Sequence, residues 1–399
     1  MKEGWENNSL GKVCRIFNGN SINADYKKTH YMGLREGYPF IATKDVSFDG
    51  LIDYENGVKI PFDEGLKVAK ASSVFICVEG GSAGRKIGLI DRDVCFGNKL
   101  FCLETKGSVL GSFIYYYLKS GLFQEQFAER LTGLIGGVSA KKFNDISIIY
   151  PPLSEQQSIV DYLDSAFAKI DAMKANAEKA LNEAKALFQA SLKEMLEPKE
   201  GWEEKKLGEM SEIQSGFAFK SIQFQKRGEF QVIRMGNVRP GIIRYNESPV
   251  FIDSVDENTI EKSLLKVGDM IITQTGSRNK RDYGFTVLID KEKLLLNQRI
   301  ARIRVVNTIT NKYLLYYSWT DYFRDQYFAN EGGTVGQGNV GIDAIRYAVI
   351  SYPSLSEQQS IVATLDSLKS KVDRLQENYE KISQECDALK QAILKQVFE

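Results

Sequence analysis

Residues Leu153–Val160 read LSEQQSIV, and Leu355–Val362 repeat the same eight letters without change. A Tyr-Pro pair stands shortly before each copy. Near the start of each half, Gly-Trp-Glu with a following Leu-Gly occurs at residues 4–11 and again at 201–208. This spacing predicts one unit of about 200 residues that is duplicated, with similar ends and divergent middles.

The repeated octapeptide is expected to open a long helix in each half. Prolines precede both copies and cannot continue a helix backwards. Ser154 stands three residues before Gln157, which is the spacing of a capping box, and the second copy repeats it. We therefore expect helices of about 40 residues, about 60 Å long, over 154–198 and 356–399.

Apolar residues in both predicted helices follow coiled-coil spacing, with alternating steps of three and four residues. The first seam, which passes through Met173, is rich in alanine and takes an extra step of four at Ala177–Leu181, a stutter. The second seam carries large residues. Small residues facing large ones predict that the two helices pack on each other, antiparallel, within the chain. The residues assigned to this packing are Ile159, Leu163, Ile170, Leu181, Phe188, Ile361, Leu365, Leu368, Val372, Leu375, Ile382, Leu389 and Ile393.

The regions before the two helices, 1–153 and 199–355, are predicted to be α+β domains. Short apolar runs such as 74–78 are typical of strands, and the aromatic segments 115–127 and 313–328 are typical of helices. The predicted fold is therefore two similar α+β domains joined by two long helices that form an intramolecular antiparallel coiled coil. Because the halves are alike, we expect pseudo-twofold symmetry.

Composition excludes several classes of protein. The 399 residues carry 52 Lys+Arg and 52 Asp+Glu, and a net charge of zero argues against an indiscriminate nucleic-acid coat. A single histidine, His30, argues against His-centred nucleophilic sites and zinc hydrolases. The five cysteines lack zinc-ligand spacing and are expected to be reduced thiols. Neither a transmembrane run nor a signal peptide is recognisable, so we expect a cytoplasmic protein.

Three motifs that are associated with catalysis are incomplete or absent in this sequence. The loop 79–86 has glycines one residue too close for a phosphate loop, and Lys86 is followed by Ile87 rather than Ser or Thr. Glu203-x-Lys205 resembles part of a metal-nuclease motif but has no convincing upstream aspartate. The Asn/Asp-Pro-Pro-Tyr tetrapeptide of adenine methyltransferases is absent. We therefore expect no catalysis, no metal and no cofactor in this chain.

Glycine- and serine-rich loops with basic residues occupy matching places in the two halves, at 79–86 and 275–281. Such loops suit phosphate contact, whereas Arg, Asn and Gln pair with base edges. The second half is more basic, over Lys266–Arg304, and late glycine-rich loops follow at 133–139 and 332–339. An ordinary solvated face is the alternative for each residue. The candidate DNA-binding residues are Lys44, Arg85, Lys86, Lys99, Lys141, Lys142, Arg234, Asn237, Arg239, Arg278, Asn279, Lys280, Arg281, Arg299, Gln337 and Asn339.

These features together resemble the specificity subunit of type I restriction-modification systems, over essentially the whole chain. The resemblance is carried by the duplication, by Pro-x-Leu-Ser-Glu-Gln-Gln opening each long helix, and by Gly-Trp-x-x-x-x-Leu-Gly opening each variable region. It implies that each variable region is a target-recognition domain that reads one half of a split site in double-stranded DNA, while the coiled coil sets the spacing. It also implies two methylation subunits, which would hold S-adenosylmethionine, and two restriction subunits as partners.

Two other interpretations of the sequence stay open. A coiled coil with two arms is also compatible with a protein-interaction scaffold that has no DNA role. A fused methyltransferase fragment is disfavoured by the missing tetrapeptide. The duplicated arms and their basic loops favour the DNA reader over both.

Overall fold

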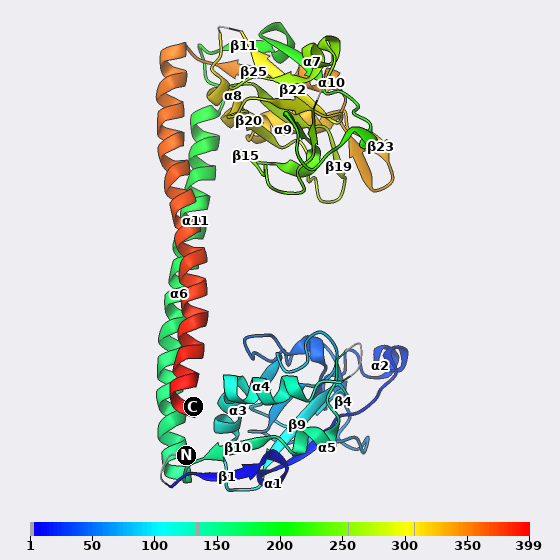
Figure 1. The fold of residues 1–399 in the computed structure, drawn as a ribbon, viewed down its shortest axis with the longest axis vertical. Coiled ribbons are helices and arrows are strands. Elements are labelled where there is room, and N and C mark those ends of the chain that lie inside the picture. The colour runs from blue at the N-terminus through cyan, green and yellow to red at the C-terminus, as the bar shows by residue number, and fades with distance from the viewer. Residues whose placement is uncertain (1–3, 133–135, 254, 307) are drawn as a thin grey trace. The chain divides into compact units, whose positions relative to one another are not determined.

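The computed structural model describes residues 4–132, 136–253, 255–306 and 308–399 (Figure 1). The chain folds into two compact units, which divide within the long helices. Unit 1 comprises Met1–Glu178 and Tyr379–Glu399, and unit 2 comprises Lys179–Asn378. Both units mix helices and sheets, so the predicted α+β class is confirmed.

Unit 1 contains two four-stranded sheets and a strand pair. Its strands are β1 (Glu6–Ser9), β2 (Cys14–Asn18), β3 (Tyr38–Ile41), β4 (Lys59–Ile60), β5 (Val68–Ala69), β6 (Val74–Cys77), β7 (Ile87–Leu89), β8 (Val94–Phe96), β9 (Leu100–Thr105) and β10 (Ser147–Tyr150). Its short helices are α1 (Leu10–Val13), α2 (Ala24–His30), η1 (Thr43–Asp45), α3 (Gly111–Lys119), α4 (Gly121–Glu129) and α5 (Ala140–Asn144). The sheets have the orders β2-β9-β6-β7 and β4-β3-β8-β5, and β1 pairs with β10.

Unit 2 repeats this plan and adds to it. Its strands are β11 (Glu203–Lys206), β12 (Ser211–Ser215), β13 (Phe230–Ile233), β14 (Val238–Arg239), β15 (Ile242–Ile243), β16 (Phe251–Ile252), β17 (Leu264–Leu265), β18 (Met270–Thr273), β19 (Thr275–Ser277), β20 (Thr286–Leu288), β21 (Leu294–Leu296), β22 (Ile300–Val305), β23 (Gly332–Thr334), β24 (Gln337–Asn339) and β25 (Val349–Tyr352). Its short helices are η2 (Leu207–Glu209), η3 (Ser221–Gln223), η4 (Met235–Asn237), α7 (Glu257–Ser263), α8 (Asn311–Tyr317), α9 (Asp321–Ala329) and α10 (Ile342–Tyr347).

The sheets of the two units have equivalent strand orders. The orders β12-β22-β18-β20 and β16-β13-β21-β17 match those of unit 1, and β11 pairs with β25 as β1 pairs with β10. In the described part of the chain, unit 2 alone has the three-stranded sheet β19-β24-β23 and the pair β14-β15. The duplication seen in the sequence is therefore a duplication of topology.

Within each unit, the repeated segment near the start pairs with the strand that precedes the long helix. The hydroxyl of Tyr150 on β10 donates a hydrogen bond of 2.9 Å to Glu6 on β1, and Tyr352 on β25 donates one of the same length to Glu203 on β11. Lys205 also lies 3.2 Å from Glu203. The Glu203-x-Lys205 pattern therefore has a structural explanation: Glu203 binds Tyr352 and Lys205 in the strand pair β11–β25.

The long helices α6 (Leu153–Leu196) and α11 (Leu355–Phe398) each have 44 residues. Within unit 1, Asp171 pairs with Lys390 and Lys174 with Asp387, so residue numbers rise along α6 as they fall along α11. Within unit 2, Lys185 donates to Gln376 at 2.8 Å. The helices run antiparallel, as predicted.

Most of the predicted seam is buried, but it is displaced in two places. Met173 is 59% exposed and Leu389 is 48% exposed, whereas Leu394 is 1% exposed. The side chain of Lys174, half-buried beside Asp387, takes the place expected for Met173. Near the end of α11 the buried face moves by one residue, because Leu394 and Phe398 pack into the core of the unit 1 domain as well as against α6.

The other predicted seam residues are buried to different extents. Buried members are Leu163, Ile170, Leu181, Phe188, Ile361, Leu365 and Val372. Half-buried members are Ile159, Leu368, Leu375, Ile382 and Ile393. The stutter in α6 consequently falls at Ile170–Lys174 rather than at Ala177–Leu181, since Lys174 and Ala177 are the half-buried positions.

The predicted capping box at the helix start is wrong. Helix α6 begins at Leu153, and the backbone N–H of Glu155 bonds to the carbonyl of Pro152. Gln157 donates to Asp161 within the helix instead of reaching back. Ser154 is therefore the second residue of the helix, two positions after the N-cap, and does not cap it.

The first glutamine of the repeat anchors each long helix to its domain. Gln156 accepts a hydrogen bond from the N–H of Leu110 at 2.9 Å and donates to the carbonyls of Ser108 and Pro151. Gln358 makes the same three contacts in unit 2. Both side chains are 0% exposed. A buried amide with three bonds is costly to replace, which accounts for its presence in both copies.

Each aromatic segment forms two helices rather than the one predicted. Ser120 caps α4 by accepting from Phe123 N–H, and Thr320 caps α9 by accepting from Phe323 N–H. A Ser or Thr at this point ends one helix and starts the next. The tyrosines before the break attach the domains to the long helices, since Tyr116 donates to Asp164 and Tyr316 donates to Asp366.

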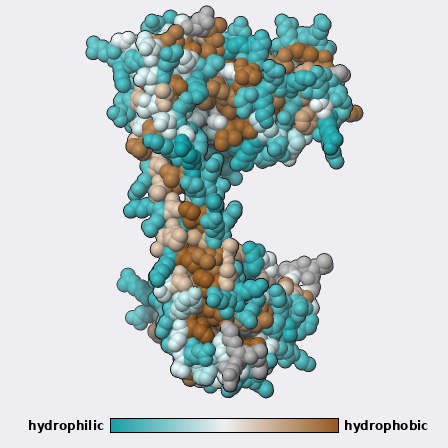
Figure 2. Space-filling model, turned by 60° about the vertical axis from the view of Figure 1, so that its left-hand side comes forward, coloured by the Kyte–Doolittle hydropathy of each residue, from teal (hydrophilic) through white to brown (hydrophobic). Residues whose placement is uncertain are grey.

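The surface and the cysteines bear on the classes considered above. Hydrophilic residues cover most of the face shown in Figure 2, and none of the described helices is long and apolar enough to cross a membrane. All five cysteines are buried and form no disulfide. Burial raises the pKa of Cys95 to about 11, which disfavours the reactive thiolate.

Candidate nucleic-acid interface

Three loops of unit 2 meet at one end of the sheet that contains β18. The N–H of Gln274, just after β18, bonds to the carbonyl of Arg299 in the β21–β22 turn at 2.9 Å. The N–H of Val340, just after β24, bonds to the carbonyl of Gln274 at 2.8 Å. These backbone bonds bring together loops that are separated in sequence, and most of the candidate residues lie on them.

Unit 1 brings its loops together in the same way. The N–H of Val78 bonds to the carbonyl of Lys99 at 3.1 Å, and the N–H of Val138 bonds to the carbonyl of Val78 at 3.2 Å. The loop that ends at Val138 includes residues 133–135, which lie outside the described residues. The framework for a loop cluster is therefore present in both copies.

A pocket of about 450 Å³ in unit 2 places two candidate arginines together. It is lined by Arg234, Met235, Gly236, Asn237, Glu247, Ser248, Asn297, Gln298 and Arg299. Arg299 has a left-handed φ of 68°, a conformation that a residue with a β-carbon adopts at an energetic cost. Strain of this kind is typical of binding sites.

Two polar atoms of this pocket have no partner. Arg234 Nη2 donates to the Ser248 carbonyl at 2.5 Å, but Arg234 Nε and Asn297 Oδ1 are buried without a hydrogen bond among the described residues. Buried polar groups are normally satisfied. A guanidinium N–H and an amide oxygen thus lie unpartnered beside the pocket, although neither is exposed to solvent. Sequence reasoning missed Asn297, because the search was directed at basic residues such as its neighbour Arg299.

Asn237 has a structural role, which corrects its assignment to DNA contact. It is 3% exposed, its Oδ1 accepts from the N–H of Arg234, and its Nδ2 donates to the carbonyls of Arg244 and Glu247. Asp45 holds the equivalent turn in unit 1 by accepting from the N–H of Ala42 at 2.8 Å. An Asn or Asp is needed here to hold the turn.

Other basic residues of unit 2 are occupied within the domain. Arg278 contacts Glu331 at 3.3 Å and donates to the Gly332 carbonyl at 2.8 Å. Arg239 donates to the Gly236 carbonyl and lies 3.6 Å from Glu247. These two arginines hold loops in place, so their sequence assignment as direct contacts is weakened.

The stretch Lys266–Arg304 is less positive at the surface than its sequence suggested. Arg302 is 7% exposed and donates to Gln214 at 2.6 Å. Arg304 makes a bidentate pair with Asp269 at 2.7 and 2.8 Å. Both arginines lie on β22 two residues apart, so they share one face of the sheet, where these contacts occupy them.

Several candidates of unit 2 remain exposed. Lys280 and Arg299 form no ion pair with any described residue, and Arg281 lies 4.9 Å over the ring of Phe328. The other exposed candidates are Asn279, Gln337 and Asn339. Lys280 and Arg299 are therefore the basic side chains of this cluster with the most freedom to meet phosphate.

Unit 1, like unit 2, has both occupied and exposed candidates. Lys86 donates to the Thr43 carbonyl at 2.9 Å, next to exposed Lys44, and it shares the ring of Phe48 with Arg85. Lys99 lies 3.5 Å from Glu79. Lys141 and Lys142 are exposed on α5.

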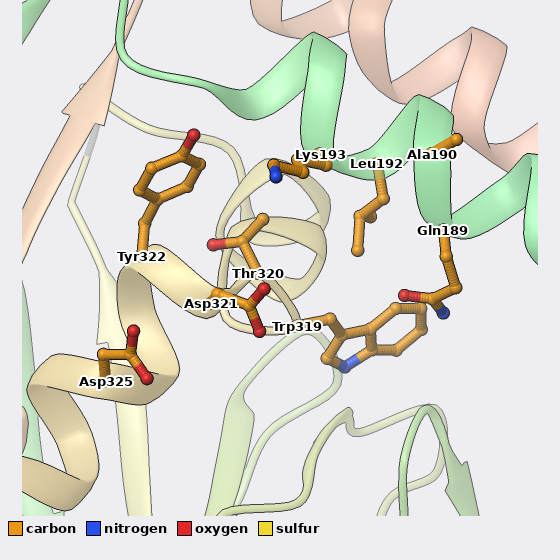
Figure 3. A pocket seen from close by; sticks show the side chains of 9 residues that line it. All are labelled: Gln189, Ala190, Leu192, Lys193, Trp319, Thr320, Asp321, Tyr322 and Asp325. Atoms are coloured by element: carbon orange, nitrogen blue, oxygen red, sulfur yellow. The ribbon is translucent and has the colours of Figure 1, made fainter.

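A second pocket of unit 2, of about 470 Å³, lies between α6 and the α8–α9 corner. Figure 3 shows Gln189, Ala190, Leu192 and Lys193 on the α6 side, and Trp319, Thr320, Asp321, Tyr322 and Asp325 on the other. Its lining contains no histidine or cysteine. Within the described ranges, no group of three or more His, Cys, Asp or Glu side chains is placed to hold a metal ion.

The chain is similar to known proteins over most of its length. The family model described as "Type I restriction modification DNA specificity domain" matches residues 2–183 and 199–384. The specificity subunit of the type I restriction enzyme EcoKI from Escherichia coli K12 is 22% identical, covering 100% of this chain and 89% of that protein. The MjaVIII specificity subunit of Methanocaldococcus jannaschii is 25% identical, covering 96% of this chain and 90% of that one.

Two solved structures have the same fold. One comes from a study entitled "Structural basis underlying complex assembly and conformational transition of the type I R-M system", with a TM-score of 0.75 at 16% identity, covering 100% of this chain and 98% of that one. The other is the HsdS subunit of Thermoanaerobacter tengcongensis, with a TM-score of 0.55 at 18% identity, covering 100% and 97%.

Proposed function

This chain belongs to the type I restriction modification DNA specificity family, and we propose that each of its units reads one half of a bipartite target in double-stranded DNA. It is a specificity subunit with two tandem recognition domains. The observation that carries the proposal is the loop cluster that recurs in both units, with Lys280 and Arg299 unneutralised in unit 2. Exposed Lys and Arg on loops suit the phosphate contacts that position a reader on duplex DNA.

The pocket that holds Arg234 and Arg299 is the proposed phosphate contact of unit 2. The exposed Arg299 guanidinium of this pocket would make a charge-assisted bond to a phosphate oxygen. Arg299 stands in the β21–β22 turn with a left-handed backbone, and its side chain is exposed. Lys44, Lys86, Lys141 and Lys142 are the proposed counterparts in unit 1, where positive charge is thinner.

The partner subunits are proposed from a repeat in the exposed face of the long helices. Residues 186–196 read ALFQASLKEML and 388–398 read ALKQAILKQVF. Leu187 and Leu389 are 57% and 48% exposed, and Ala190, Lys193, Ala392 and Lys395 are exposed as well. Identical exposed residues in both units suit two copies of one partner, which we take to be the methylation subunit.

The remaining roles are proposals that follow from this one. The methylation subunits would hold S-adenosylmethionine, two restriction subunits would complete the complex, and this chain would contribute recognition without catalysis. The lengths of α6 and α11 would set the spacing between the half-sites. A protein scaffold without a DNA role is not favoured by the family match.

The test is a double charge reversal, Lys280→Glu with Arg299→Glu, in the reconstituted complex. The host methylome defines the target duplex, and affinity is measured against salt concentration. We expect at least a ten-fold loss of affinity and a salt slope reduced by about two, since each lost phosphate contact removes about 0.9.

The matched control is Lys262→Glu with Lys266→Glu, which makes the same charge change at the other end of β18. It should keep wild-type affinity. Wild-type affinity and salt slope in the Lys280–Arg299 variant would remove that pair from the interface. A wild-type complex that binds no duplex preferentially, in a host whose methylome has no split motif, would refute the proposed function.

A further inference from the structure

The three-stranded sheet β19-β24-β23 of unit 2 has two chemically different faces. Ser277, Gln337 and Thr334 are aligned across the three strands, and Gly276, Gly338 and Gly333 are aligned in the next row. Paired residues on neighbouring strands share a face, and successive residues alternate between faces. One face therefore carries a row of three glycines, and the opposite face carries polar side chains.

Two of the three glycines, Gly276 and Gly338, pack directly against the domain. A β-carbon added at Gly338 would lie 1.9 Å from Tyr283 Oη, and one at Gly276 would lie 2.7 Å from Tyr283 Cδ1. A β-carbon at Gly333 would instead lie 2.2 Å from the Gln337 carbonyl oxygen of the neighbouring strand, and Gly333 is exposed. Strands β19 and β24 therefore lie against Tyr283, and their other face is turned outward.

Polar contacts hold the ribbon in place. The Tyr283 hydroxyl donates to Glu331, and Arg278 contacts Glu331 at 3.3 Å and the Gly332 carbonyl at 2.8 Å. The N–H of Arg278 also bonds to the Gly336 carbonyl at 3.2 Å. These contacts join both strands of the β23–β24 hairpin to the domain. The hairpin is therefore presented as a fixed element.

The outward face carries groups without partners. The side-chain amides of Gln337 and Asn339 are exposed and form no hydrogen bond with a described residue. Val335, at the hairpin tip, is 103% exposed. The face continues toward Met235 of the arginine pocket, since Thr275 contacts Met235 Sδ at 3.2 Å. Base-reading groups thus adjoin the proposed phosphate contact.

We propose that the β23–β24 ribbon enters the major groove of one half-site, where Gln337 hydrogen-bonds an adenine edge and Val335 contacts the methyl group of a thymine. This inference rests on the proposed function and names its specificity-determining residues. The major groove, about 12 Å wide, admits a two-stranded ribbon. A Gln amide matches the donor and acceptor of adenine, and a small apolar side chain matches the thymine methyl.

The experiment uses the reconstituted complex and duplexes of the methylome-defined target. Each thymine is replaced in turn by deoxyuridine, which lacks only the methyl group, and each adenine by 7-deazaadenine, which lacks the N7 acceptor. Val335→Ala should bind the normal target about five-fold more weakly, and one deoxyuridine duplex should weaken the wild type without weakening Val335→Ala further. Gln337→Ala should lose about 5- to 150-fold and become insensitive to one 7-deazaadenine.

Val267→Ala is the matched control, because Val267 is also exposed, at 58%, in the turn at the other end of β18. It should behave as wild type, and all three variants should unfold at the wild-type temperature since the side chains are exposed. Wild-type affinity in Val335→Ala and Gln337→Ala, or unchanged sensitivity to every modified base, overturns the ribbon proposal. If Lys280→Glu with Arg299→Glu still loses binding in that case, the proposed function stands without it.

Discussion

Units 1 and 2 have the same side chains at the buried contacts that join each domain to its long helix, and different side chains in the surrounding loops. Gln156 and Gln358 anchor the long helices through the same three bonds. Just before the residue that caps α4 in unit 1 and α9 in unit 2, unit 1 has Lys119 where unit 2 has Trp319. Lys119 donates to the Asp49 carbonyl at 2.9 Å, and Trp319 donates to Thr286 at 2.9 Å. The framework tolerates little change because its polar groups are buried, whereas the periphery can change with each unit's task.

The loop clusters diverge most. The described part of unit 1 joins its late loop to the sheet through the isolated bridges Glu79–Gly137 and Thr132–Gly137, whereas unit 2 builds a three-stranded ribbon. Lys99 is paired with Glu79, whereas Arg299, at the same turn, is not paired with any described carboxylate. Recognition chemistry is therefore a property of each unit separately.

The largest expected effect tests the shared anchor. Gln156→Leu should lower the free energy of unfolding by about 3 to 5 kcal/mol, because it strands three buried backbone groups, and Gln358→Leu should do the same. Hydrogen exchange along the full chain should show loss of protection in unit 1 for the first variant and in unit 2 for the second.

The adjacent glutamines are the controls for this comparison. Gln157→Leu and Gln359→Leu alter exposed positions of the same repeat and should change the free energy of unfolding by less than about 0.5 kcal/mol. Equal loss of protection in both units after either anchor substitution would show that the anchors are not local.

A smaller effect on the free energy of unfolding is expected at Lys119, whose counterpart in unit 2 is the uncharged Trp319. Burial, with the nearby charge of Lys390, lowers the pKa of Lys119 to about 8 from 10.5. Between these pH values the unfolded chain holds a proton that the folded chain has lost, so stability rises with pH across this window. Below pH 8 the full cost of the buried charge remains. Lys119→Met should therefore raise the free energy of unfolding by about 1 to 3 kcal/mol at pH 7 and remove the alkaline rise.

Denaturant unfolding between pH 7 and 10.5 measures both parts of this prediction. Lys169→Met, an exposed lysine of α6 in unit 1, should leave the profile unchanged. A Lys119→Met protein whose stability still rises between pH 8 and 10.5, as in the wild type, would show that another group titrates there.

The smallest effect on stability concerns the repeated exposed leucines. Leu187→Glu and Leu389→Glu should each change the free energy of unfolding by less than about 0.5 kcal/mol, because both side chains are solvated. Native mass spectrometry of the complex should show one methylation subunit in place of two for each variant. Met173→Glu, at an exposed apolar position whose counterpart Leu375 is half-buried, should keep both. Two bound subunits in all three variants would place the docking surface elsewhere.

Local patterns predicted the framework well. The exact repeat predicted the duplication, and heptad spacing predicted paired antiparallel helices, because burial along a helix follows a short period that can be read from residue type. The pattern failed at Met173, Leu389 and the capping box. At Leu389 the buried face is shifted by contacts of Leu394 and Phe398 with the unit 1 domain. At Met173 the pair of Lys174 with Asp387 takes the inward position. Such contacts are not encoded in the spacing of one helix, and the capping box failed because the helix begins one residue earlier, at Leu153.

The sequence by itself determined that the chain is duplicated, that each half ends in a long amphipathic helix, and which residue types are available to meet DNA. The tertiary structure decided which of those residues are free. Asn237, Arg239 and Arg278 look alike as candidates in the sequence, yet all three are occupied by hydrogen bonds within the domain. The sequence alone could not show that Gly276 and Gly338 pack on Tyr283 or that Val335 is exposed. Exposure and hydrogen bonding depend on neighbours that are distant in the chain.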